Sequence, residues 1–297
     1  MHVIVTGAAG RLARAVLPLL CEHPAIERVT GIDRVAVAYR HPKLATRAVD
    51  IADRAARDTL HDADALINLA FVVLRGHMSL AAMTATNVEA TKALLLAAAD
   101  AGIASIVHMS SAAVYGCGID LAEDAPLAPL PRFAYAQHKA DVDRFLAATL
   151  PPVAVLRPTI VLGPNAHPLL KALLALPFHV RVPDPQPRLC VVHEDDVAAA
   201  VLLALDLRAR GPFNLAAPST FSVRDVVRAR HAWAPGVPPV LARAALEVAW
   251  RTTGWGGEPG WLDGAGASLT LDCTRARRLL GWQARHEDCN AIIASCN

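Results

Sequence analysis

Short apolar runs alternate with helical stretches along the first 160 residues of the chain. The apolar runs are HVIVT, VTGI, RAVD, ALINLA, SIVHMS and VAVLR. Apolar residues at helical spacing lie at about 10–20, at about 78–100 and in the segment that follows Phe133. Strands that alternate with helices predict a parallel sheet covered by helices on both faces. The pattern therefore predicts a doubly wound α/β fold.

The alternation weakens after the segment LRPTIVLGP, which ends at Pro164. Pro-rich connections follow, and separate helices are expected around 166–176, 195–207, 222–231 and 240–252, with a last one at TRARRLLGW. We expect residues 1–163, joined by 189–215, to form the main domain, and residues 164–188 and 216–297 to form a smaller, partly interleaved lobe. The Gly- and Trp-rich segment 251–266 is expected to be a loop.

Composition excludes several classes of protein. The chain is 54% hydrophobic and 19% charged, which is typical of a globular protein and not of a disordered one. A net charge of +2 without a basic block argues against a nucleic-acid partner. Six cysteines without a CxxC pair favour reduced thiols in the cytoplasm over disulfides or a zinc site. We expect a soluble cytoplasmic protein with no signal peptide, no membrane span and no metal.

The acidic run HEDDVA contains a histidine and three carboxylates in sequence. Because it stands directly before an apolar helical stretch, Glu194, Asp195 and Asp196 are interpreted as helix-start residues that favour the helix dipole. His193 takes the same interpretation. No HExxH or comparable ligand spacing supports a metal site elsewhere.

A glycine-rich turn follows the first apolar run, in the segment VIVTGAAGRLARAV. Gly7 and Gly10 allow the backbone to turn tightly and to approach a pyrophosphate, whose charge is favoured at a helix N-terminus. Ala13 is the third small residue of this pattern and permits close packing of helix on strand. The turn predicts a dinucleotide site.

Asp33 ends the second apolar run, a little over 20 residues beyond Gly10. A carboxylate at this place accepts hydrogen bonds from the adenosine ribose of NAD and repels the 2′-phosphate of NADP. A turn-forming aspartate is the alternative interpretation. Arg34 and Arg11 keep NADP open, because either arginine could pair with its extra phosphate. Asp50 either contacts the adenine or caps the helix that follows.

Tyr135 precedes Lys139 by four residues, in the segment FAYAQHKADVDRFL. With three tyrosines and four lysines in 297 residues, chance predicts about 0.04 such pairs. Residues four apart share one face of a helix. Ser111, in IVHMSSAAVYG, follows a predicted central strand, at the carboxyl edge where open α/β sheets bind ligands. The three side chains could therefore converge beside a nicotinamide.

Several motifs in order resemble one family, the extended short-chain dehydrogenases/reductases, also called the NAD-dependent epimerase/dehydratase family. The motifs are TGAAGRLA, NLAF, NVEAT, SSAAVYG, YAQHK, LRPTIVLGP, VHEDDVA, FNLAAP and LGW, and they run over most of the chain. The motifs are similar to those of bacterial members that resemble UDP-glucose 4-epimerase. The resemblance implies a Rossmann-type sheet, in which residues 1–163 bind the dinucleotide, and a second lobe that binds a small-molecule substrate.

The resemblance also implies roles for individual residues. Tyr135 would be the general acid/base, Lys139 its activator and ribose ligand, and Ser111 a donor to the substrate oxygen. Asn87 would support the site, or would only bond neighbouring backbone as a helix residue. The cofactor would be NAD, with NADP not excluded, and would be bound by Gly7, Gly10, Arg11, Leu12, Asp33, Arg34, Asp50, Ile51, Leu69, Ala70, Tyr135, Lys139 and Pro158. The substrate would contact Ser111, Ala112 and Arg188.

A free tyrosine has a pKa of about 10, which is too high for a base near neutrality. An ammonium at about 4 Å and an effective dielectric constant near 20 would stabilise the phenolate by up to about 4 kcal/mol, or about 3 pKa units. We therefore expect Lys139 to lower the pKa of Tyr135. The phenolate would take a hydroxyl proton while hydride leaves the same carbon, and Ser111 would stabilise the developing charge.

The net reaction stays open among three classes. An oxidoreductase exchanges its nicotinamide and makes a redox product, an epimerase retains it through each cycle, and a dinucleotide sensor needs no Ser-Tyr-Lys set. The family's nucleotide-sugar enzymes usually carry an Arg-x-Gly-Asp-like segment whose arginine holds the diphosphate, but this chain has EPGWLD there. We therefore favour net oxidation or reduction of a secondary alcohol or ketone. Arg188 is the candidate phosphate contact, and a homodimer is a possible assembly.

Overall fold

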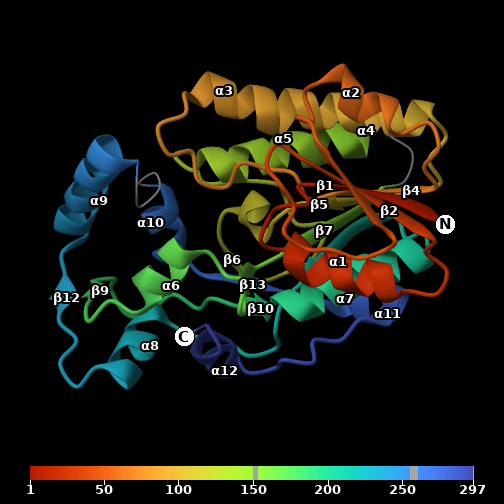
Figure 1. Ribbon diagram of the computed structural model, residues 1–297. Helices are drawn as coiled ribbons and strands as arrows, with labels where there is room; N and C mark the ends of the chain where they lie inside the picture. Colours follow the sequence, from red (N-terminus) through yellow and green to blue (C-terminus); the bar gives the residue numbers. More distant parts are fainter. Residues whose placement is uncertain (150–152, 255–259, 297) are drawn as a thin grey trace.

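The central element of the computed structural model, which describes residues 1–149, 153–254 and 260–296, is a seven-stranded parallel sheet (Figure 1). Its strand order is β11-β7-β5-β4-β1-β2-β3. The bounds are β1 His2–Thr6, β2 Arg28–Asp33, β3 Leu44–Ala48, β4 Ala65–Asn68, β5 Ser105–Met109, β7 Ala154–Pro158 and β11 Gly211–Leu215. Both halves of the chain contribute, because β11 returns to pair with β7.

Helices cover both faces of this sheet (Figure 1). One face carries α1 (Ala13–Glu22), α7 (Glu194–Asp206) and α11 (Thr274–Leu280), and the other carries α2 (Arg54–Asp58), α3 (Leu80–Thr84), α4 (Thr91–Asp100) and α5 (Ala134–Thr149). Side chains of β1 alternate between the two faces, because Val3 and Val5 pack on the first face and Ile4 on the second. The predicted doubly wound α/β fold is confirmed.

The third strand differs from its prediction. The apolar run RAVD was expected to form it, but β3 ends at Ala48 and begins at Leu44. This strand is the sheet edge, and residues 45–48 are exposed. An edge strand needs few apolar side chains, so its apolar pattern is weak.

Outside the central sheet and the helices that cover it, the described residues form short two-stranded parallel pairs and further helices. The pairs are β6 (Gly118–Leu121) with β13 (Leu269–Leu271), β8 (Ile160–Leu162) with β10 (Val191–His193), and β9 (His179–Val180) with β12 (Gly236–Val237). The helices are α6 (Pro168–Leu174), α8 (Val223–Arg230), α9 (Pro239–Thr253), α10 (Gly260–Ala265) and α12 (Cys289–Ala294). None of the described helices is both long and apolar enough to cross a membrane.

The last third of the chain does not stay in one lobe. Ala276, Leu280 and Trp282 belong to the same hydrophobic cluster as β1, α1 and α7. We therefore propose that residues 273–282 count with the main domain, and that the expected lobe of residues 216–297 is interrupted there.

The expected loop at 251–266 is wrong at both of its ends. Residues up to Thr253 continue α9, and Gly260–Ala265 forms α10, while residues 255–259 lie outside the described part of the chain. A Cβ on Gly260 would stand 2.1 Å from the carbonyl oxygen of Arg132. Glycine at this position thus lets α10 pack against the start of α5, a use that a loop interpretation of glycine misses.

Candidate active site

The glycine-rich turn at Gly7–Gly10, which we call the phosphate turn, joins β1 to α1. It passes close to the backbone just after β4. Gly7 has a φ of +71°, and a Cβ there would stand 2.6 Å from the backbone nitrogen of Ala70. Gly10 donates its backbone N–H to the Gly7 carbonyl at 2.8 Å. Only glycine combines this positive φ with this contact at low cost. The turn therefore leaves the start of α1 open to an anion.

A cavity of about 150 Å³ lies against this turn. It brings together eight of the residues predicted to bind the cofactor and five others. The lining residues are Gly7, Gly10, Ile32, Asp33, Arg34, Val49, Asp50, Ile51, Leu69, Ala70, Phe71, Val72 and Thr86. Apart from Thr86, they come from the carboxyl ends of β1, β2, β3 and β4 and from the segments that follow these strands, where a parallel sheet binds its ligands.

Asp33, one of the two acidic residues of this cavity, is held by backbone donors. Asp33 Oδ2 accepts from the backbone N–H of Ala9 at 3.0 Å, and Oδ1 accepts from that of Val35 at 3.2 Å. Arg34 stands 3.7 Å from Asp50 Oδ2. The guanidinium that could receive a 2′-phosphate therefore already faces a carboxylate.

The remaining predicted cofactor residues do not line the cavity. Arg11 donates to the carbonyl of Ala166 at 3.4 Å, so it links the phosphate turn to the segment after β8. Leu12 is the N-cap residue of α1, and Pro158 ends β7. Their proposed contacts with the cofactor remain predictions.

Ser111 and Tyr135 meet at the carboxyl edge of the sheet. Ser111 follows β5 and accepts from the backbone N–H of Ala113 at 3.2 Å, which caps the 3₁₀ helix η2 (Ala112–Tyr115) and leaves the hydroxyl hydrogen free to donate. Ser111 also acts on Tyr135, in the first turn of α5, because it opposes the rise in the pKa of that phenol. The structure therefore brings the sequence-predicted pair together at this edge.

Lys139 lies deeper than Tyr135. Its side chain is 3% exposed, and Nζ donates to the Met109 carbonyl. The ammonium position is 3.4 Å from the centre of the Phe71 ring and 6.0 Å from that of Tyr135. Cation–π contacts within about 6 Å are attractive, and a buried one is stronger than an exposed one.

We predicted that the pKa of Tyr135 would be lowered, and for the protein without bound ligand this prediction is wrong. Burial raises the pKa of Tyr135 above its usual value, and the hydrogen bond with Ser111 opposes that shift. Burial also lowers the pKa of Lys139 to about 7, so its charge is only partly present near neutrality. The sequence estimate assumed an ammonium at about 4 Å and omitted desolvation, which here has the larger effect.

Asn87 supports the loop after β4. It lies in the π-helical turn η1 (Ala85–Ala90), accepts from the Val72 N–H at 2.7 Å and donates to the Val72 carbonyl at 2.9 Å. Val72 lines the cavity described above. Val72 is fifteen residues from Asn87 in the sequence. Asn87 therefore fixes part of the cavity wall and does not only bond the backbone of its own helix.

An aromatic group around Tyr135 was not anticipated from the sequence. The Phe71 ring meets the Tyr135 ring edge-on at 5.6 Å, and the Trp261 ring is stacked on it at 5.6 Å. Phe133 contacts both Tyr135 and Trp261. Phe71 is the last residue of the NLAF motif, so the sequence could have indicated its place near the site. Trp261 is more than 120 residues from Tyr135 along the chain, and no local pattern connects the two.

Arg188 and Ala112 are the remaining predicted substrate contacts. Ala112 is buried in η2 next to Ser111. Arg188 is exposed, and its backbone bonds to Ser268 and Leu269. No contact within the described ranges joins Arg188 to Ser111, Tyr135 or the small cavity. Glu258 and Pro259 of the segment EPGWLD lie outside the described residues.

The acidic run begins α7 as expected but does more than that. His193 Nδ1 accepts from the Asp195 N–H and caps the helix, while buried Asp196 accepts from the backbone N–H groups of Arg285 and His286. His193, Asp195 and His286 bring ligand atoms within 4.8 Å of one another. The Nδ1 lone pair of His193 already accepts the capping hydrogen bond, and the His193 and His286 rings stack with their centres 3.8 Å apart. We therefore interpret this cluster as a structural contact between the start of α7 and the C-terminal segment.

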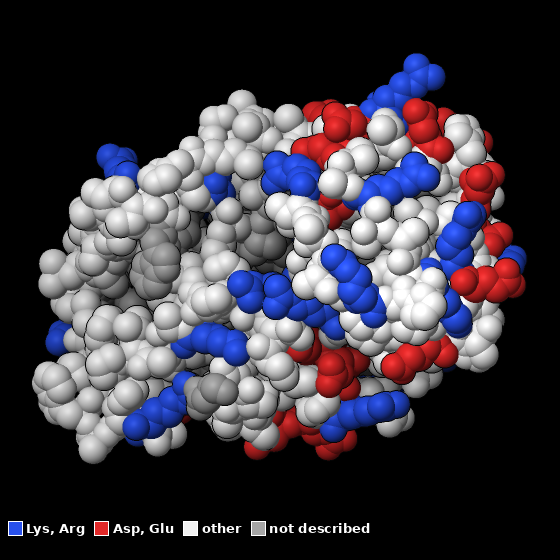
Figure 2. Space-filling view, viewed as in Figure 1, with Lys and Arg blue, Asp and Glu red and all other residues white. Residues whose placement is uncertain are grey.

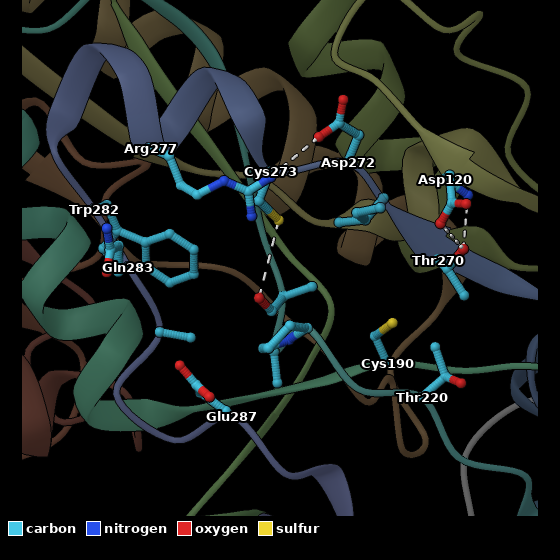
Figure 3. Close-up of a pocket in the computed structure, with 15 residues that line it drawn as sticks. Asp120, Cys190, Thr220, Thr270, Asp272, Cys273, Arg277, Trp282, Gln283 and Glu287 are labelled. Atoms are coloured by element: carbon cyan, nitrogen blue, oxygen red, sulfur yellow. Dashed lines mark hydrogen bonds and ion pairs between the residues drawn. The ribbon is translucent and has the colours of Figure 1, made fainter.

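A second cavity, of about 650 Å³, is the larger of the two but contains none of the predicted catalytic residues (Figure 3). Carboxylates and thiols line it, among them Asp272 at 3.7 Å from Arg277. Burial raises the pKa values of Cys190 and Cys273 to about 12, so both thiols stay protonated. The larger cavity therefore does not coincide with the predicted site.

Charge is unevenly distributed over the face drawn in Figure 2. Lys, Arg, Asp and Glu side chains gather over the main domain, whereas the lobe that carries α8 and α9 is mostly uncharged in this view. The exposed apolar residues of that lobe include Trp233, Val240 and Val248.

Comparison with known proteins identifies similar chains. A model of the NAD dependent epimerase/dehydratase family matches residues 3–216. The low-salt glycan biosynthesis protein Agl12 of Haloferax volcanii is 32% identical over 185 residues, which are 57% of this chain and 59% of that protein. The dTDP-glucose 4,6-dehydratase of Streptomyces griseus is 30% identical over 156 residues, which are 48% of each.

The chain therefore spans only about half to three-fifths of the length of these two curated relatives. Similarity to a solved structure is more extensive. The structure of MoeE5 in complex with UDP-glucose and NAD superposes with a TM-score of 0.75 at 25% identity, and covers 99% of this chain and 97% of that one.

Proposed function

Because the chain belongs to the NAD-dependent epimerase/dehydratase family, we propose that it is an NAD-dependent oxidoreductase that acts on a secondary alcohol or ketone of a sugar-like substrate. The observation that carries this proposal is the placement of Ser111 near Tyr135, with Lys139 on the same helix face, next to the cavity behind the phosphate turn. A dinucleotide sensor would need only that cavity.

The residues present fit NAD. A Cβ on Gly7 would fill the close approach of the phosphate turn to Ala70, and Asp33 stands in the same cavity with its carboxylate fixed. Gly7 and Gly10 would hold the pyrophosphate, and Asp33 the adenosine ribose. When bound, NAD supplies the acceptor of hydride, and its reduced form supplies the donor.

Tyr135 is the proposed general acid/base. Its hydroxyl would donate a proton to a ketone oxygen, or its phenolate would accept one from a hydroxyl. Ser111 would donate a hydrogen bond to the same oxygen as negative charge develops there. Phe71 and Trp261 flank the Tyr135 ring and would exclude water from this proton transfer.

The first prediction concerns cofactor choice. We expect NAD to bind more tightly than NADP, because Asp33 is fixed in the cavity and Arg34 faces Asp50. Asp33→Ala should erode that preference, as measured by calorimetric titration of both dinucleotides. Asp58→Ala, which removes an exposed carboxylate that does not line the cavity, is the matched control. A tenfold wild-type preference for NADP, about 1.4 kcal/mol, would show that Arg34 dominates.

The second prediction concerns the net reaction. We expect the NADH absorbance to change in proportion to product when the protein is offered uronic acids, aldoses, simple ketones and UDP-hexoses. A second candidate function, epimerisation or dehydration of a nucleotide sugar with retained NAD, is favoured by the similarity to a dTDP-glucose 4,6-dehydratase and to MoeE5. Conversion of UDP-hexoses without net absorbance change would decide for that second function.

We further propose a cytoplasmic homodimer. The five buried cysteines are free thiols in the structure, which suits a reducing compartment. A monomeric mass in sedimentation at working concentration would exclude the dimer.

A further inference from the structure

Three charged side chains are buried together beneath the candidate active site. Lys139 and Asp143 lie on α5, and Arg157 lies on β7. Their exposed fractions are 3%, 3% and 6%. Burying a charge is costly unless it is paired, so the arrangement of these three groups constrains how many of them stay ionised.

Arg157 fixes the carboxylate of Asp143. Its Nε donates to Asp143 Oδ2 at 2.8 Å, while Nη1 donates to the Tyr115 hydroxyl at 2.8 Å and to the Glu123 carbonyl at 3.1 Å. Tyr115 in turn donates to Asn214 Oδ1 at 2.8 Å. The guanidinium is thus held from several sides, and the carboxylate with it.

Helical spacing places this carboxylate beside the lysine. Tyr135, Lys139 and Asp143 are at positions i, i+4 and i+8 of α5 and therefore share one face. Burial raises the pKa of Asp143, and the Arg157 guanidinium opposes that rise. The negative charge of Asp143 in turn favours the ammonium form of Lys139.

The other groups around Lys139 cannot balance its charge. On β5, the Met109 carbonyl accepts from Nζ, and buried His108 is held neutral because burial and Lys139 keep its pKa well below the usual value. The Phe71 ring faces Nζ from the loop after β4. Arg157, from β7, is itself a cation. Of the neighbours within the described ranges, Asp143 is the anion that acts on Lys139.

We propose that Asp143 is a positioning residue whose carboxylate, anchored by Arg157, keeps Lys139 in its ammonium form next to Tyr135. Its importance for catalysis rests on the proposed function, but its effect on Lys139 does not. Without Asp143, the buried Lys139 would lose the anion that favours its charge, and it would lose its proton at a lower pH. Burial already lowers the pKa of Lys139 to about 7, and Asp143 opposes that lowering.

The experiment is a pH titration of the protein labelled with carbon-13 at the lysine ε position. The chain has four lysines, Lys43, Lys92, Lys139 and Lys171, so the spectrum is simple, and Lys139→Met assigns the signal. In Asp143→Asn the Lys139 transition should fall by at least about 1 pH unit, the low end of the shift that a nearby opposite charge produces. An unchanged transition overturns the proposal.

The matched control is Asp141→Asn, on the exposed part of the same helix. Asp141 pairs with Arg144 at 3.0 Å and should leave the Lys139 transition where it is. If Asp143→Asn fails to fold because Arg157 is left unpaired, Asp143→Asn/Arg157→Met removes both charges and should still lower the transition. Asp143→Glu should restore it.

The pH profile of kcat/KM then separates this inference from the proposed function. In Asp143→Asn the alkaline loss of activity should move to lower pH together with the Lys139 transition. A shifted transition with an unchanged profile would support the electrostatic role of Asp143 and would overturn the assignment of Lys139 to the reaction.

Discussion

Tyr135→Phe should reduce kcat by about 10²–10⁴-fold, the usual contribution of a positioned proton donor, while NAD affinity changes only a few-fold. The phenol ring packs among Phe71, Phe133 and Trp261, and phenylalanine keeps those contacts. Only the hydroxyl, whose pKa responds to Ser111, is lost. Steady-state kinetics and calorimetric titration of NAD measure the two effects separately.

Ser111→Ala tests the partner of this hydroxyl. It should lose about 10²–10³ in rate if Ser111 stabilises developing negative charge on the substrate oxygen. Tyr39→Phe is the matched control, because Tyr39 stacks on His41 and has no contact with the candidate site in the described ranges. Near-normal kinetics in both Tyr135→Phe and Ser111→Ala would refute the assignment of these residues.

Lys139→Met should remove a pH dependence of stability that the wild type shows. The pKa of Lys139 is lowered from 10.5 to about 7 in the folded protein, so the unfolded chain binds this proton more tightly. The contribution of Lys139 to the free energy of unfolding therefore rises as the pH rises from about 7 toward 10.5, by about 2 kcal/mol between pH 7 and 9. Denaturant titration at several pH values measures this slope.

The pH window for this measurement has an upper limit. Cys190 and Cys273 have pKa values raised to about 12 from 9.0, so the unfolded thiols lose protons first, and stability falls with pH above about 9. Lys171→Met removes a surface lysine and should keep the wild-type slope. A slope between pH 7 and 9 that persists in Lys139→Met would mean that another group titrates there.

Local patterns predicted the fold well and the site only in part. The alternation of strands and helices identified the parallel sheet, because each strand buries both faces and each helix one stripe. The i, i+4 spacing of Tyr135 and Lys139 indicated a shared helix face. The contact of Trp261 with Tyr135 could not be predicted, because the two residues are far apart in the sequence. The bounds of β3 were missed because this edge strand has mostly exposed side chains and therefore a weak apolar pattern.

Desolvation is the physical term that sequence reasoning could not supply. The expected effect of Lys139 on Tyr135 assumed a full charge at close range, whereas burial holds the ammonium near its titration point. The extension of the Tyr135–Lys139 spacing to Asp143 was visible in the sequence. Its meaning depends on Arg157, which comes from a different strand.

The packing of Ala276, Leu280 and Trp282 into the main core has a consequence for how the protein is made. Chains are synthesised from the N-terminus at about 5–20 residues per second, and domains generally fold as units when they emerge. Helix α1 is among the first segments to be synthesised. It shares a hydrophobic core with residues 273–282, which follow it by some 260 residues in the sequence and leave the ribosome later. The first domain must therefore wait, with part of its apolar surface uncovered, until residues 273–282 have been translated, and chaperone contact during synthesis is expected to last until that point.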